Sequence, residues 1–347
     1  WILNVGDIKP AEYQVELFLD MAWNLEAVKR QGVVAHQRHF LEREFGKNRA
    51  DRLQPVMQEA YRLAYIRKPE FMGNTRTEEK DPKFKVISDL PWCEQEINER
   101  LAAYRQLSDK VEQEWHALPA QKKETYFQLV KYPVQAAAQM NNKLLTAQLA
   151  RHGKADWADS DRAYDSIVSL TKTYNTTKWN RMMDFQPRRL LVFNRVERKA
   201  LSSGLLEKPQ AVYTWNGADC VEGASVICEG LGYEGKAVAV EKKKELTFEF
   251  AAWETDSVEV EVRLLPNHPV EGERLRFTIS LDGSATEAVS YETKGRSEEW
   301  KENVLCNQAV RRMILPVARK ASHRLIFTAL DEGVVLDQIC LYTPRIK

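Results

Sequence analysis

The first ten residues bring together side chains that could contact a substrate. Residues 1–5 have the apolar composition of a short buried strand, and Asn4 stands near the end of it. In a (β/α)8 barrel the loops after the strands carry the chemistry, and an amide there can both donate and accept hydrogen bonds. Lys9 could pair with a carboxylate on the same ligand. We therefore single out Asn4 and Lys9 as substrate-binding candidates, with a turn-forming Asx residue and a solvated lysine as the alternatives.

The nearby carboxylates do not form a recognisable catalytic pair. Asp7 is better explained as the cap of a helix that starts at Pro10, because a carboxylate there satisfies free backbone donors. Glu12, close to the same turn, is a weaker candidate for a substrate contact. Glu16 and Asp20 lie on a helix that should be packed, and ordinary surface carboxylates explain them. We assign no catalytic residue within the chain.

Two sequence patterns resemble parts of a metal site and of a dinucleotide site, but the residues around them do not complete either site. His36 and His39 are spaced as i and i+3 on a helix, but no third ligand has a recognisable spacing. Residues 230–235 match GxGxxG, yet the sequence from Lys236 onward alternates like a strand, where a dinucleotide site needs a helix. The stretch therefore predicts a β-turn region. We expect neither a metal nor a cofactor.

The cysteines are five in number and widely spaced. They form neither a disulfide framework nor a CxxC metal motif, so most of them should be buried thiols. In an oxidising compartment, one disulfide between Cys220 and Cys228 is the alternative. The five are Cys93, Cys220, Cys228, Cys306 and Cys340.

Composition describes an ordinary globular protein of two or three domains. The chain has 347 residues, of which 44% are hydrophobic and 29% charged. Its 51 Lys and Arg residues balance 50 Asp and Glu residues, so no net field favours nucleic acid. No apolar run approaches the roughly 18–20 residues of a membrane span.

A change in hydrophobic periodicity near 202–204 predicts a domain boundary. The spacing before it indicates helices at about 10–25, 26–45, 50–67 and 97–115, with a restart at Pro119 and a kink at Pro133. Ser160 offers the N-cap of a last helix whose inward face would carry Ala163, Tyr164, Ile167, Thr171 and Tyr174. An antiparallel bundle of about five long helices follows from this pattern.

After residue 210 the period becomes two. Alternating apolar residues predict five strands, and Asp282-Gly283 closes one of them with a turn signal. The run from Glu241 to Glu245 is typical of a solvated edge or turn. The apolar positions are Leu246/Phe248/Phe250, Val258/Val260/Val262/Leu264, Leu275/Phe277/Ile279/Leu281, Leu325/Phe327 and Ile339/Leu341. They indicate a sandwich or jelly roll.

Several separate motifs, in order, carry a family resemblance. WILNVGDIKPAEY, RLAYIRKPEFMG, LVKYPVQAAAQMNN, TTKWNRMMDFQPR, GLGYEGKAV and LPNHPVEGERLRFTISLDG resemble glycoside hydrolase family 115, which removes glucuronic acid from xylan. The likeness covers nearly the whole chain. The expected fold is therefore a multidomain α+β protein. It has the C-terminal end of a (β/α)8 barrel at 1–25, an all-α helical bundle at 26–200, and an all-β, carbohydrate-binding-module-like sandwich at 210–347.

The resemblance also implies function. It places Asn4 in the substrate pocket and puts the catalytic acid and base of an inverting enzyme on earlier barrel strands. Such a reaction needs two carboxyl groups about 6.5–9.5 Å apart. We therefore expect an N-terminal barrel domain as partner, xylan or glucuronoxylan as substrate, no cofactor, and no turnover by this chain alone. Family members tend to be homodimers, and the family places the protein outside the cytoplasm, secreted or periplasmic.

A second hypothesis is not enzymatic. The bundle and sandwich could act as a carbohydrate-binding or dimerisation scaffold. Trp179, Trp215 and Trp253 could stack on a sugar ring, with core packing as the alternative for each. Saturable sugar binding by the sandwich would favour a binding module.

Overall fold

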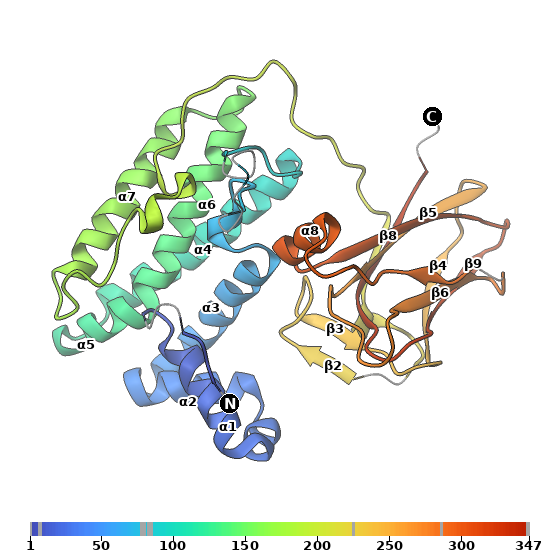
Figure 1. The fold of residues 1–347 in the computed structure, drawn as a ribbon, viewed down its shortest axis with the longest axis horizontal. Helices are drawn as coiled ribbons and strands as arrows, with labels where there is room; N and C mark the ends of the chain where they lie inside the picture. The colour runs from blue at the N-terminus through green and yellow to red at the C-terminus, as the bar shows by residue number, and fades with distance from the viewer. Residues whose placement is uncertain are drawn as a thin grey trace. The chain divides into compact units, whose positions relative to one another are not determined.

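The computed structural model describes residues 2–5, 9–76, 81, 86–223, 226–284 and 287–344 and divides into two compact units (Figure 1). Unit 1 comprises Trp1–Leu63 and Lys68–Glu207 and is helical. Unit 2 comprises Ala64–Arg67 and Lys208–Lys347 and contains the strands. A helical bundle followed by a β-sandwich is thus confirmed. No helix among the described ranges has the length and apolarity to cross a membrane.

Unit 1 is built around one central helix. Its helices are α1 (Glu12–Gln31), α2 (Val33–Phe45), α3 (Lys47–Ile66), α4 (Glu94–His116), α5 (Ala120–Tyr126), α6 (Tyr132–Arg151) and α7 (Trp157–Asn175). Helix α6 lies beside α7 (Figure 1) and is buried on most of its circumference. Its polar side chains are bonded rather than excluded: the Asn141 amide, for example, accepts from Arg100 at 2.8 Å. A helix buried on all sides is the interior element of a bundle.

Two helix interruptions have clear chemical causes. Helices α1 and α2 are divided at Gly32, whose φ of 82° lies in the left-handed region that glycine adopts without strain. Within α1 the backbone also breaks at Asn24, where φ and ψ are −151° and 82° and the side chain accepts from the Ala27 N–H at 3.1 Å, close to the boundary that the sequence suggested at residue 25. Before Pro133 the backbone forms a π-helical turn, Phe127–Lys131. Proline cannot donate a backbone hydrogen bond, so an irregularity ahead of it is expected.

The N-cap of α7 differs from the prediction. Asp156, not Ser160, is the capping residue, and its carboxylate accepts from the Ala158 N–H at 2.9 Å. Ser160 lies inside the helix, where its hydroxyl donates to the Lys143 carbonyl at 2.7 Å. Aspartate and serine both cap helices well. The capping side chain belongs to the residue that immediately precedes the helix, and in α7 that residue is Asp156. The predicted inward face is otherwise confirmed, except that Tyr164 is half-buried.

The strand expected at residues 1–5 does not form. Described residues 2–5 have no strand pairing with any other described residue, and they are mostly exposed. A parallel barrel strand exists only through hydrogen bonds to its neighbours. The described strands all belong to unit 2 and pair with one another there.

Unit 2 packs two antiparallel sheets face to face. The larger has the order β2-β3-β10-β5-β8, with β1 also paired to β10, and the smaller has the order β4-β9-β6-β7. The strands are β1 (Tyr213–Asn216), β2 (Val226–Glu229), β3 (Lys236–Ala239), β4 (Glu245–Ala251), β5 (Ser257–Leu264), β6 (Arg276–Leu281), β7 (Val289–Ser290), β8 (Ala309–Pro316), β9 (Ser322–Ala329) and β10 (Val335–Tyr342). A short helix, α8 (Glu298–Cys306), precedes β8.

The alternating residues of the predicted strands form the sandwich core. Phe248, Phe277 and Phe327 are all at most 1% exposed, and the rings of Phe277 and Phe327 stack with centroids 5.2 Å apart. Residues 230–235 form turns, as expected. All five cysteines are free, so Cys220 and Cys228 are not bridged.

Candidate functional site

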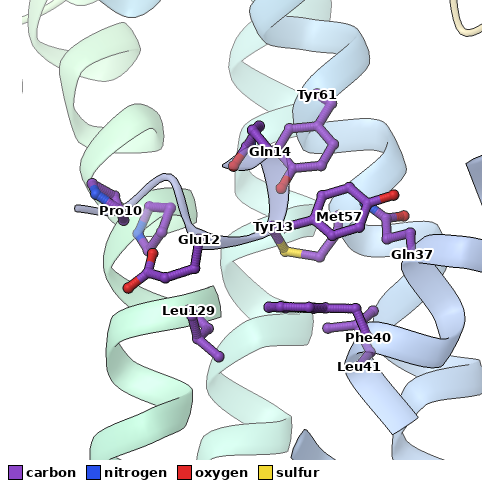
Figure 2. Close-up of a pocket in the computed structure, with 11 residues that line it drawn as sticks. Pro10, Glu12, Tyr13, Gln14, Gln37, Phe40, Leu41, Met57, Tyr61 and Leu129 are labelled. Carbon is purple, nitrogen blue, oxygen red and sulfur yellow. The ribbon is translucent and has the colours of Figure 1, made fainter. Parts of the chain in front are cut away.

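A small pocket opens between α1, α2, α3 and the start of α6, within unit 1 (Figure 2). Tyr13 and Tyr61 form its wall, with their rings stacked at a centroid distance of 6.2 Å and an interplanar angle of 10°. Phe40 meets the Tyr13 ring edge-on at 5.3 Å. Burial raises the pKa of Tyr61 to about 12 and that of Tyr13 well above its usual value. Both phenols therefore stay protonated and act as hydrogen-bonding groups.

The polar lining of the pocket consists mainly of amides. Gln14 hydrogen bonds to Tyr61, and Gln37 accepts from Gln54 at 3.3 Å. Glu12 is the single carboxylate among the residues that line the pocket. One carboxylate cannot supply both the acid and the base of glycoside hydrolysis. The lining therefore offers aromatic faces and amide hydrogen-bonding groups, without a pair of carboxylates for hydrolysis.

Next to the pocket residue Glu12, Lys9 connects two parts of the sequence that are 170 residues apart. Its ammonium forms an ion pair with Glu12 and lies 4.2 Å from the centroid of the Trp179 ring. Lys178 also approaches this ring, with its ammonium 5.4 Å from the centroid. Lys9 is partly buried, so the contact with the indole is only partly screened by water.

The loop that presents Trp179 is fixed at both ends. The Asn175 side chain donates to the Met183 carbonyl at 2.7 Å and accepts from its N–H at 3.0 Å. The indole packs against the cluster of Phe127, Tyr132 and Tyr174. Its Nε1 is buried and has no hydrogen-bond partner in the described part of the chain. Trp179 therefore has a defined position, to which Lys9 attaches.

The predicted site residues do not all converge. Asn4 is exposed and, within the described ranges, forms no hydrogen bond, and neither Asn4 nor Lys9 is among the residues that line the pocket. Asp7 lies outside the described residues. The described residues Ala11 and Glu12 begin α1 without a side-chain cap.

The remaining carboxylates and histidines have structural partners. Glu16 binds Arg43 through two bonds of 2.9 and 2.7 Å, as expected of a surface carboxylate. Asp20 pairs with His36 at 2.9 Å, whereas His39 contacts Gln31 at 2.8 Å. The two histidines thus do not share a ligand, and the described residues contain no cluster of three metal-binding side chains.

Sequence reasoning did not identify the pocket itself. Met57 and Tyr61 are spaced as i and i+4 on α3, and Gln37, Phe40 and Leu41 share a face of α2. Such spacing signals only a buried face. The polar residue Gln37 on this face of α2 was the one sequence feature indicating that the face is not purely hydrophobic core.

We expect Lys9 and Trp179 to be energetically coupled. In a double-mutant cycle with Lys9→Met and Trp179→Leu, the coupling free energy should be about 0.5–1 kcal/mol, measured by urea unfolding. The pair of Lys178→Met with Trp179→Leu is the matched control and should give a smaller coupling, because Lys178 is exposed and farther away. Equal couplings would show that Lys9 has no special contact.

The described structure is thus an α-helical bundle followed by a two-sheet sandwich, with a pocket lined by aromatic and amide side chains in the bundle. Models of two protein families match the chain: glycosyl hydrolase family 115 at residues 1–71, and the glycosyl hydrolase family 115 C-terminal domain at residues 224–347. The chain belongs to glycoside hydrolase family 115.

Solved structures agree with this assignment. A family 115 4-O-methyl-α-glucuronidase, described as having specificity for decorated arabinogalactans, is 62% identical to the chain with a TM-score of 0.96. The match covers 99% of this chain and 46% of that protein, so the chain spans about half the length of this relative. A comparison with curated protein sequences found no match.

Carbohydrate-binding modules give much weaker matches. A family 35 module from Clostridium thermocellum is 10% identical with a TM-score of 0.30, and the match covers 38% of this chain and 98% of the module. A family 6 module from Cellvibrio mixtus lichenase 5A is 14% identical with a TM-score of 0.30, covering 39% of this chain and 100% of the module. Likenesses of this size support no conclusion about the sandwich.

Proposed function

We propose that the chain is the C-terminal accessory region of an inverting α-glucuronidase that releases glucuronic or 4-O-methylglucuronic acid from a plant polysaccharide. The observation that supports this most is the 62% identity, over 99% of the chain, to a 4-O-methyl-α-glucuronidase. The catalytic acid and base would be supplied by a barrel domain that precedes residue 1 in the parent protein. The pocket of unit 1 contains a single carboxylate, which is consistent with a catalytic acid and base on another domain.

Two polysaccharides are candidates for the substrate. The sequence motifs favour the α-1,2 linkage of glucuronic acid to xylan, whereas the relative's description names decorated arabinogalactans. The same resemblance supports a homodimer that is secreted or periplasmic. Activity on each polysaccharide should be measured side by side.

Within this function we assign substrate contacts to Asn4 and Lys9. The Asn4 side chain is exposed and available to a ligand. Lys9 is held by Glu12 and Trp179, and its ammonium can attract the carboxylate of a uronic acid. An amide can bind the sugar hydroxyls at the same time.

A domain exchange with the 62% identical relative tests the proposal. Its N-terminal portion, joined to residues 1–347 of this chain, should release glucuronic acid from glucuronoxylan or decorated arabinogalactan, while the chain alone should release none. Asn4→Ala in the chimera should lower kcat/KM about 5- to 30-fold, which corresponds to the loss of about 1–2 kcal/mol of hydrogen bonding. Release of glucuronic acid by the isolated chain would contradict a catalytic acid and base on another domain, and a folded but inactive chimera would contradict the assigned function.

A further inference from the structure

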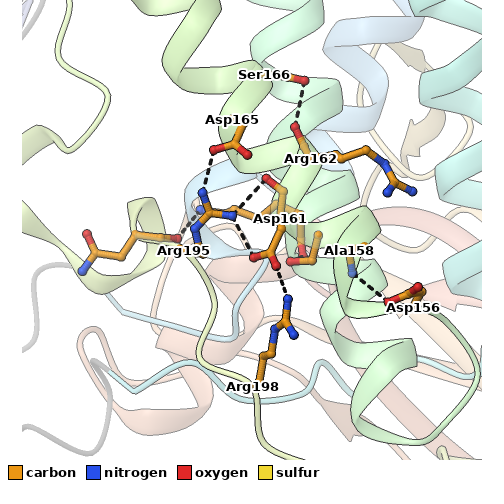
Figure 3. A network of polar contacts seen from close by, with 11 residues as sticks. Asp156, Ala158, Asp161, Arg162, Asp165, Ser166, Arg195 and Arg198 are labelled. Carbon is orange, nitrogen blue, oxygen red and sulfur yellow. Dashed lines mark hydrogen bonds and ion pairs between the residues drawn. The ribbon is translucent and has the colours of Figure 1, made fainter.

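The segment that leaves the bundle is held along unit 1 by several contacts. We call residues 195–203 the strap. Arg195 donates to Asp165 at 2.6 Å, and Arg198 pairs with Asp161 at 2.6 Å (Figure 3). Farther along, the Leu201 N–H donates to the Arg151 carbonyl at 2.8 Å. The strap ends four residues before Glu207, the last residue of unit 1.

The last contact of the strap is made by a histidine between two oxygen acceptors. The His152 side chain is only 4% exposed. Its Nδ1 contacts the Ser203 carbonyl, and its Nε2 lies 2.6 Å from Asp89 Oδ2. The other oxygen of Asp89 accepts from Arg151 at 2.6 Å. Both oxygens of Asp89 are therefore engaged by nitrogen groups, one by Arg151 and one by His152.

The geometry determines the protonation state that the site requires. A carbonyl oxygen and a carboxylate can only accept hydrogen bonds, so both ring nitrogens must donate. Only the imidazolium carries a proton on each nitrogen. In either neutral tautomer one nitrogen lone pair would face an acceptor oxygen at hydrogen-bonding distance. His152 is also the C-cap of α6, where the helix dipole favours a positive charge.

We propose that His152 is a pH-dependent latch that holds the strap on unit 1 when the imidazole is protonated and releases it when the proton is lost. Histidine is the residue whose charge ordinarily changes between pH 5 and 8. The latch determines how much of the chain that leads to unit 2 is fixed to unit 1. It does not depend on the enzymatic function proposed above.

One other charged group close to the strap titrates in the same range. Lys143 on α6 donates to the carbonyls of Val192 and Asn194, just before the strap, and burial lowers its pKa to about 7. Asp89 and Arg151 form the ion pair described above, and Lys154 pairs with Glu94 at 3.3 Å. On α7, hydrogen bonds from Arg195 and then Arg198 hold the pKa of Asp161 below its usual value, so this group stays charged above pH 5. The ion pair of Arg198 with Asp161 thus persists between pH 5.5 and 8.5. Lys143→Met is therefore a second control, and it should leave the pH dependence at Leu201 unchanged if the response comes from His152.

Hydrogen exchange on the full chain tests the latch. After correction for intrinsic rates, the protection factor of the Leu201 amide should be roughly tenfold higher at pH 5.5 than at pH 8.5, as expected for one charge-assisted hydrogen bond. His152→Gln should remove this dependence and leave the amide poorly protected at both pH values. Equal protection of the unmodified chain at the two pH values would overturn the proposal.

Two further variants keep the test decisive even if His152→Gln disturbs the end of α6. Asp89→Asn places an amide N–H opposite Nε2, so a neutral ring with its proton on Nδ1 satisfies both contacts. The strap should then stay protected at pH 8.5, and a variant that keeps the wild-type pH dependence would contradict the latch. His36→Gln is the matched control: this buried histidine pairs with Asp20 but does not touch the strap. It should leave the tenfold difference unchanged, and loss of the difference would point to a general effect of pH on unit 1.

Discussion

Phe277→Ala is expected to lower the free energy of unfolding of the sandwich by about 3–5 kcal/mol. The ring of Phe277 is fully buried between the two sheets, where it stacks on Phe327 and packs against Tyr291 at a centroid distance of 6.3 Å. Truncation would remove these contacts and leave a cavity that the paired strands on either side cannot collapse to fill. A change of this size is a large fraction of the stability of one domain.

The measurement is chemical unfolding followed separately by near-ultraviolet circular dichroism and by the helical signal at 222 nm. Ile314→Ala is the matched control in the same sandwich, because Ile314 is 65% exposed on β8 and should change stability by less than about 0.5 kcal/mol. A similar loss for both variants, or a loss confined to the helical transition, would contradict a core position for Phe277.

The strands of the sandwich core could be predicted because each one contacts the core with one face and solvent or polar groups with the other. Val258, Val260 and Val262 alternate for that reason and are fully buried in β5. Strand β8 was missed because its apolar residues do not alternate regularly, and two arginines lie in its middle. Helix α8 has nine residues, too few to show a helical period.

In the bundle, the sequence located the helices better than their ends. Helix existence depends on many apolar residues at helical spacing, whereas a cap depends on a single side chain. Asp156 and Ser160 were both plausible caps by type, and only the backbone conformation distinguishes them. The strand at residues 1–5 was predicted with its partners on preceding barrel strands, and the described part of the chain contains no strand that pairs with it.

The candidate site shows the same limit. Lys9 and Trp179 were each identified as possible ligand contacts, but no feature of the sequence indicates that they meet. Their contact depends on the position of the loop after α7, where Trp179 packs against the cluster that includes Tyr174, and on the ion pair that holds Lys9 to Glu12 at the start of α1. Periodicity reports which face of a helix is buried and not which residue lies opposite. Contacts between distant segments therefore required the structure.

The second large effect concerns Lys143, a buried ammonium that has no carboxylate partner among the described residues. Its Nζ donates to the carbonyls of Val192 and Asn194 at 2.6 and 2.9 Å, and the residue is fully buried in α6. Burial disfavours the charged form and lowers the pKa of Lys143 to about 7. In the unfolded chain the pKa returns to the ordinary lysine value of about 10.4.

The sign of the pH dependence follows from proton binding. Between pH 7 and pH 10 the unfolded chain holds a proton on Lys143 that the folded chain has released, so stability rises with pH. From Lys143 we expect the free energy of unfolding of unit 1 to increase by about 3 kcal/mol from pH 7 to pH 9.5, a window that ends below the ordinary tyrosine pKa of about 10. Below pH 7 both states hold the proton and Lys143 contributes no further slope.

Lys143→Met separates this effect from every other titrating group. The variant should lose the slope between pH 7 and 9.5 in urea unfolding monitored by the helical signal. Its absolute stability at pH 9.5 should fall, because Val192 and Asn194 each lose a hydrogen-bond donor. Lys172→Met, at an exposed position on α7, should keep the slope. A Lys143→Met protein with the wild-type slope would show that the buried ammonium does not titrate in this range, and that its two carbonyl partners compensate fully for its desolvation.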